Sequence, residues 1–197
     1  MINKKKEYKN NNLLNLLFKS KIMYGESLTS INKNILPFIY GSRYKRSIIN
    51  LNSVSFFLKR SFKLIKIILQ KNQKILVIGN NPEIQFLLNT SFIKKNINII
   101  FFNKEWINGL ITNKITNSTF NKIINYLIKE GELKLILIIK SSVKDTFLNQ
   151  ELSVIKIPII SLINTNQTLK NIDYPIITNS KNIQSIYILM YLLRKMF

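Results

Sequence analysis

The sequence contains no cysteine, no histidine and no alanine. Without cysteine the chain has no disulfide framework and no thiolate nucleophile, and without histidine it lacks the commonest metal ligand and general base. These absences argue against hydrolytic triads and zinc sites. We therefore expect no catalytic residue of the histidine or cysteine type and no metal site in this protein.

Acidic residues are also scarce. The chain has 9 Asp and Glu against 30 Lys and Arg, a formal net charge of +21, and its pI is near 10.2. A polyanionic partner explains this balance, because Lys and Arg that contact phosphates release condensed counterions. The abundance of Ile, Asn and Lys is typical of a very AT-rich gene, and that bias favours Lys over Arg. Since it does not account for the shortage of Asp and Glu, the charge indicates a nucleic-acid partner.

Long apolar runs are missing as well. No run of about 18 residues is free of charge, so the sequence predicts no membrane span. A length of 197 residues suits one well-buried domain, and we expect a single α/β domain over residues 13–197. Residues 1–12, MINKKKEYKNNN, are expected to form a basic tail that is disordered or bound to RNA. The base composition suggests an organelle gene, whose product would need no import signal.

Apolar β-branched runs alternate with helical patterns along most of the chain. Strands are expected over residues 74–79, 98–102 and 133–139, and again near residues 157 and 174. Helices are expected over residues 13–22, 53–71, 80–95, 116–130, 141–155 and 181–196. This alternation predicts right-handed crossovers and an α/β fold: a three-layer sandwich with a parallel central sheet flanked by helices, flavodoxin-like or Rossmann-like.

Polar and turn-forming residues set the expected ends of these elements. Ser53 and Ser180 are candidate N-caps of the helices that follow them. Gly131 is the expected stop of the helix before it. The glycines and the proline of residues 24–46 predict an irregular segment, which leads into a short strand at 47–51.

One alternative function is a nucleotide- or cofactor-dependent enzyme on such a fold. Its pocket would lie at the strand ends near Asn80, Asn103, Ser141 and Asn164. The strand that ends at Gly79 does lead into a helix, but a phosphate-binding loop needs three glycines or a G-K-S/T ending, and neither is present. The sequence therefore favours a tight strand-to-helix turn, and we expect no cofactor.

Three stretches carry a more specific pattern. The last runs from Ile157 to Ile186, IPIISLINTNQTLKNIDYPIITNSKNIQSI. It aligns without a gap to a pattern in two parts. The first part is I-P-V-V-A-I/L-V/N-D-T-N, and after a spacer of six residues the second part is D-Y-P-I-P-G-N-D-D-A-I-R-S-I. Asn164 stands where this pattern has aspartate, and Ile177 and Thr178 replace Pro-Gly.

The other two stretches lie earlier in the chain. Residues 24–43 follow F-G-H-x-T-x-x-W-N-P-K-M-x-P-Y-I-F/Y-G-x-R, with Glu26, Ile31 and Lys33 in place of histidine, tryptophan and proline. Residues 105–113 follow R-W-L/V-G-G-x-L-T-N, with Glu105 for arginine and Asn108 for the first glycine. All three patterns are signatures of the ribosomal protein S2 family of the small subunit, which this chain resembles across most of its length.

The resemblance implies the same α/β fold and a structural, non-catalytic role. It implies small-subunit rRNA and neighbouring ribosomal proteins as partners, with messenger RNA near the exit region, at the junction of head and body. Bacterial members insert a long helical hairpin near residues 116–130, for which this chain has no room. We expect an organelle ribosome, in the mitochondrial matrix, with a plastid as the alternative. An RNA-binding protein outside the ribosome stays open on charge alone.

Basic and polar residues near these signatures are the candidate RNA contacts. Residues 43–46 form a basic cluster with a tyrosine inside it, which suits contacts to backbone phosphates and one stacking or sugar contact. The polar face of the helix expected at 53–71 is also basic. A purely solvated face is the competing interpretation. The candidates are Arg43, Tyr44, Lys45, Arg46, Lys59, Arg60, Lys63, Asn113 and Lys114.

Overall fold

The structure is a computed structural model that describes residues 12–79, 98–102, 109, 119–139 and 146–194. Its centre is a five-stranded sheet in the order β5-β4-β6-β7-β8, in which every neighbouring pair is parallel. The strands are β4 (Lys74–Gly79), β5 (Ile99–Phe102), β6 (Leu133–Ile139), β7 (Ile159–Ile163) and β8 (Tyr174–Ile177). All five expected strands are therefore present, and the parallel sheet is confirmed.

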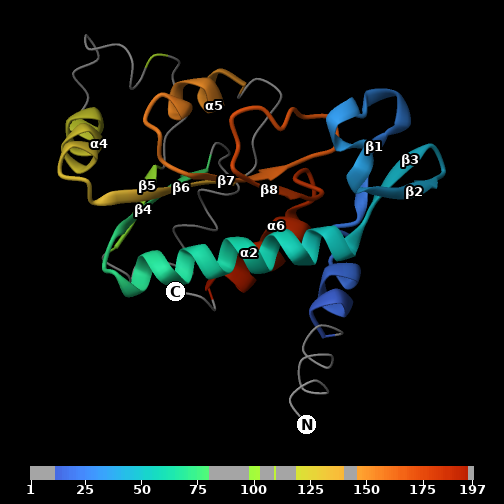
Figure 1. The fold of residues 1–197 in the computed structure, drawn as a ribbon. Helices are drawn as coiled ribbons and strands as arrows, with labels where there is room; N and C mark the ends of the chain where they lie inside the picture. The colour runs from blue at the N-terminus through green and yellow to red at the C-terminus, as the bar shows by residue number, and fades with distance from the viewer. Residues whose placement is uncertain (1–11, 80–97, 103–108, 110–118, 140–145, 195–197) are drawn as a thin grey trace.

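Helices cover both faces of this sheet (Figure 1). On one face lie α2 (Leu51–Gln70) and α6 (Ile183–Arg194), and on the other lie α4 (Thr119–Lys129) and α5 (Thr146–Ser153). In β4, Ile75 and Val77 join the apolar cluster under α2 and α6, whereas Leu76 and Ile78 join the cluster under α4 and α5. Because successive side chains of a strand point to opposite faces, one apolar strand serves two cores. The three-layer sandwich is confirmed.

A second, antiparallel sheet stands beside the first, at the N-terminal end of α2 (Figure 1). It has the order β1-β3-β2, with β1 (Tyr24–Ser27), β2 (Ile39–Arg43) and β3 (Arg46–Ile49), and the short 3-10 helices η1 (Leu28–Ser30) and η2 (Lys33–Phe38) connect β1 to β2. The prediction of an irregular segment was wrong for β1 and β2. These strands are four and five residues long and the register shifts within both pairings, so no alternation of apolar and polar residues marks them.

Both predicted N-caps were wrong. The side chain of Asn50 accepts a hydrogen bond from the Asn52 N–H and caps α2, which begins two residues before Ser53. Asn182 caps α6 in the same way through the Gln184 N–H, and Ser180 is buried ahead of it. Asparagine and serine are equally good N-caps. The residue type therefore does not tell which of two nearby polar residues caps the helix, and the position at which the helix starts to pack on the sheet decides it.

The remaining helix predictions agree where the structure describes them. Residues 12–19 are helical and bury Leu17. Gly131, with a φ of 66°, follows the end of α4 as expected for a helix stop. The helix expected at 80–95, the ends expected at 116–118, 141–145 and 195–196, and nearly all of the 1–12 tail lie outside the described residues. Among the helices described, none is long and apolar enough to cross a membrane.

Candidate RNA-binding surfaces

Four of the candidate residues meet at the tip of the β2–β3 hairpin. Arg43 ends β2 and pairs with Arg46, which begins β3, so Tyr44 and Lys45 alone form the connecting loop. All four side chains are exposed, and Tyr44 is 86% exposed. The Arg43 guanidinium lies over the Tyr44 ring, 5.3 Å from its centroid. The tip therefore presents three positive charges around an open aromatic ring.

Three further candidates lie on the solvent face of α2. Lys59, Arg60 and Lys63 are exposed, while Leu58, Ser61 and Ile65 are buried on the opposite face of the helix. Apolar residues three and four apart share one helix face, which leaves the basic residues on the other. The Arg60 guanidinium lies 5.4 Å from the ring centroid of Tyr174 in β8, so this exposed cation contacts an aromatic ring at the edge strand of the sheet.

The last two candidates, Asn113 and Lys114, lie outside the described residues. One contact of their loop is described. The Gly109 N–H donates a 3.2 Å hydrogen bond to Oε2 of Glu151, a buried carboxylate on α5. The third signature is thus attached to α5, a contact that the sequence patterns did not predict.

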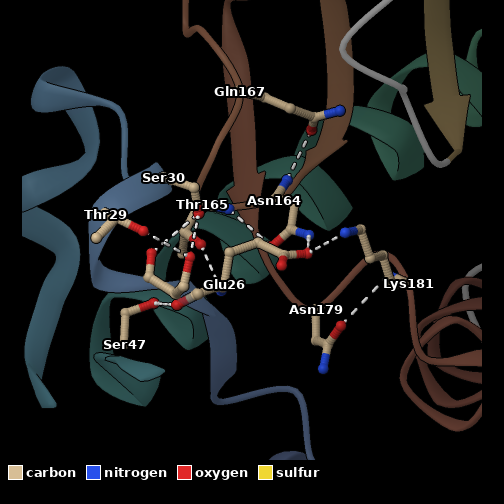
Figure 2. A network of polar contacts seen from close by, with 10 residues as sticks. Glu26, Thr29, Ser30, Ser47, Asn164, Thr165, Gln167, Asn179 and Lys181 are labelled. Atoms are coloured by element: carbon tan, nitrogen blue, oxygen red, sulfur yellow. Dashed lines mark hydrogen bonds and ion pairs between the residues drawn. The ribbon is translucent and has the colours of Figure 1, made fainter. Parts of the chain in front are cut away.

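Two of the signatures meet where the antiparallel sheet joins the end of β7, and Figure 2 shows this junction. The Glu26 N–H donates to Oγ1 of Thr165 at 2.8 Å, and the Ser47 hydroxyl donates to the Glu26 carbonyl at 3.0 Å. Gly25 is buried between them, and a Cβ on it would lie 2.6 Å from Cγ2 of Thr165. Only glycine allows the two sheets to approach this closely.

The Glu26 side chain is the centre of the junction (Figure 2). Its Oε1 accepts a 2.9 Å hydrogen bond from Nδ2 of Asn164 and forms a 2.7 Å ion pair with Nζ of Lys181. Asn164 is 2% exposed, and its N–H donates to Oε1 of Gln167 at 2.7 Å. The carboxylate therefore links β1, the end of β7 and the approach to α6.

This junction is a structural joint. Asn164, one of the four strand ends that an enzyme would use, is buried and hydrogen-bonded, and the other three lie outside the described residues. Within the described part of the chain, no group of acidic residues could hold a metal ion. Sequence reasoning missed the joint, although the departures at Glu26 and Asn164 from the signatures were its visible signal.

Comparison with known proteins gives a consistent result. The profile of the family described as ribosomal protein S2 matches residues 17–134 and 118–197. The chain is 24% identical to small ribosomal subunit protein uS2c of Galdieria sulphuraria, over 90% of this chain and 88% of that protein. It is 23% identical to uS2 of Karelsulcia muelleri, over 85% and 90%, and 24% identical to uS2 of Ehrlichia canis, over 86% and 69%.

Proposed function

The chain belongs to the ribosomal protein S2 family, and we propose that it is a structural component of the small subunit of an organelle ribosome, in contact with rRNA and neighbouring proteins. The family implies a structural role and no catalytic step. The observation that carries the proposal is the family match, which spans residues 17–197 in two overlapping segments. The net charge of +21 supports RNA as the principal partner.

The proposed mechanism is electrostatic. Cations at the hairpin tip and on α2 neutralise rRNA phosphates, so that RNA segments which repel one another lie together against one protein surface. The proposed contacts are Arg43, Tyr44, Lys45, Arg46, Lys59, Arg60, Lys63, Asn113 and Lys114. The expected position is at the junction of head and body of the subunit, near the messenger exit region.

We favour the mitochondrion, with a plastid as the alternative. Only residues 103–118 connect β5 to α4, which leaves no room for the long helical hairpin of bacterial members. The chain aligns with 69% of the Ehrlichia canis protein, 90% of the Karelsulcia muelleri protein and 88% of the uS2c of Galdieria sulphuraria. Relatives of similar length therefore include a bacterial and a uS2c protein, and length alone does not separate the two organelles. Loss of the hairpin fits a remodelled ribosome. Mass spectrometry of purified mitochondria and plastids from the source cells distinguishes the two organelles.

The test of the ribosomal role is sedimentation of an organelle lysate at moderate and at high salt, with the chain followed by mass spectrometry. We expect it to travel with the small subunit and to dissociate only at high salt, since phosphate contacts weaken as salt rises. A chain that stays at the top of both gradients would contradict the proposal. It would favour an RNA-binding protein outside the ribosome, and nucleotide-binding assays would then test the enzyme alternative.

A further inference from the structure

The tip of the β2–β3 hairpin has a backbone conformation that its residues disfavour. Tyr44 and Lys45 have φ values of 50° and 60°, and the Arg43–Arg46 pair closes a two-residue loop, which is the geometry of a type I′ turn. Asn-Gly is the usual sequence there, because a bulky side chain crowds the left-handed backbone. Tyr44 is the sole aromatic residue with a positive φ in the described part of the chain.

The strain indicates a role beyond closing the hairpin. The chain is rich in asparagine, and the other left-handed non-glycine positions described outside this tip hold asparagine at Asn72 and Asn171 and lysine at Lys21 and Lys156. A residue that fits the turn is therefore common in this sequence, yet the tip has tyrosine. Strained positions of this kind persist where the side chain they display has a function.

The backbone that displays the Tyr44 ring is tied to a neighbouring element, and the ring itself is open to solvent. The Leu28 N–H donates a 3.1 Å hydrogen bond to the Lys45 carbonyl, which ties the tip to the start of η1. The Arg43 guanidinium lies over one face of the ring. Because Tyr44 is 86% exposed, the other face is open to solvent.

We propose that Arg43 and Tyr44 form a stacking platform for one unpaired RNA base, while Lys45 and Arg46 hold the phosphates beside it. Aromatic rings and guanidinium planes stack on bases that have left a duplex, whereas bases inside a duplex already stack on one another. No acidic residue interrupts the four. The inference rests on the proposed function, since it specifies the kind of RNA that this surface takes.

The test compares two RNA probes on the purified full chain by fluorescence anisotropy at one salt concentration. One probe is a single-stranded uridine oligonucleotide, and the other is a blunt-ended duplex of two annealed strands, without unpaired bases and with the same number of phosphates. Tyr44→Asn should weaken binding of the single strand by roughly 5- to 100-fold and leave duplex binding unchanged. It should also raise the thermal midpoint by a few degrees, because asparagine tolerates the left-handed backbone.

Two matched variants separate the contribution of the aromatic ring to RNA binding from the contributions of the neighbouring charge and of the backbone strain. Tyr44→Phe keeps the ring and should bind both probes as the wild type does. Lys45→Gly relaxes the backbone but keeps Tyr44, and it should weaken both probes equally through the lost charge.

Two results would overturn the platform. Equal affinities of Tyr44→Asn and wild type for the single strand would exclude it, as would equal losses on both probes. A tip that contacts protein would give the first of these results. Failure of the proposed function is seen in a different measurement, because a chain that stays at the top of the sedimentation gradients can still bind both probes.

Discussion

At the scale of single residues, the close approach of the two sheets depends on Gly25. An alanine there would bring its Cβ within 2.8 Å of Oγ1 of Thr165 and against the Ser47 hydroxyl, so both hydrogen bonds to the Glu26 backbone would be disturbed. We expect Gly25→Ala to lower the free energy of unfolding by about 2–3 kcal/mol. Urea denaturation followed by circular dichroism measures the loss.

Gly41 provides the matched control. A Cβ at this position in β2 would meet no atom within 4 Å. Gly41→Ala should therefore change stability by less than about 1 kcal/mol, and in the stabilising direction if the unfolded chain loses entropy. Equal losses from the two substitutions would show that the crowding at Gly25 is relieved by movement of its neighbours.

A second prediction at this scale concerns how much the hydrogen bond between Glu26 and Asn164 contributes to stability. Asn164→Asp would place two carboxylates where a 2.9 Å hydrogen bond now lies, one of them fully buried. We expect a loss of roughly 2 kcal/mol or more. Glu26→Gln combined with Asn164→Asp exchanges donor and acceptor across the same contact, so it should recover much of that loss.

A double-mutant cycle on the free energy of unfolding measures this coupling. Lys181→Ala is the control, and since its side chain is 66% exposed, its ion pair should contribute little. If the losses of the two single substitutions simply add in the double variant, the contact is not the joint that the geometry indicates.

At the scale of elements, the two faces of α2 are expected to have different roles: the buried face stabilises the fold, and the exposed basic face binds RNA. Ile65 is fully buried under the sheet, and Ile65→Ala should cost about 2–5 kcal/mol of stability. Lys66 is a further exposed lysine of α2, three residues after Lys63. Lys63→Gln with Lys66→Gln changes only exposed positions, so stability should move by less than about 0.5 kcal/mol per residue. The same pair should reduce the slope of log affinity for RNA against log salt by roughly 1.5 to 2.

Anisotropy titrations across a salt series, beside thermal melts, distinguish the two faces. An unchanged salt slope in the double glutamine variant would assign this face of α2 to solvent, which is the competing interpretation of any basic helix face. Reduced RNA affinity in Ile65→Ala at a temperature where it is fully folded would contradict the division.

At the scale of the whole molecule, the two sheets form a continuous network through the junction in Figure 2. We propose that residues 13–197 fold as one domain, and we expect one cooperative transition in calorimetry, with equal calorimetric and van't Hoff enthalpies. Two transitions would contradict this and would place the antiparallel sheet in a unit of its own. In that case Gly25→Ala should shift the two transitions unequally.

Much of this fold was predictable from the sequence. β4 and β6 have the predicted bounds, because an apolar β-branched strand covered on both faces leaves a continuous run in the sequence. The short strands β1 and β2 were not predicted, since their residues gain partners only from the folded neighbours. The caps at Asn50 and Asn182 were missed because several polar residues stood near each helix start.

The sequence by itself determined the parallel sheet, its helical layers, the charge that calls for RNA and the family signatures, because each depends on composition or on spacing over a few residues. Only the tertiary structure decided which distant residues meet. Glu26 and Asn164 are 138 positions apart, and their contact depends on how two sheets pack. The exposed position of Tyr44 likewise depends on the pairing of β2 with β3. This pairing requires a left-handed turn at Tyr44 and Lys45, a conformation that these residue types disfavour.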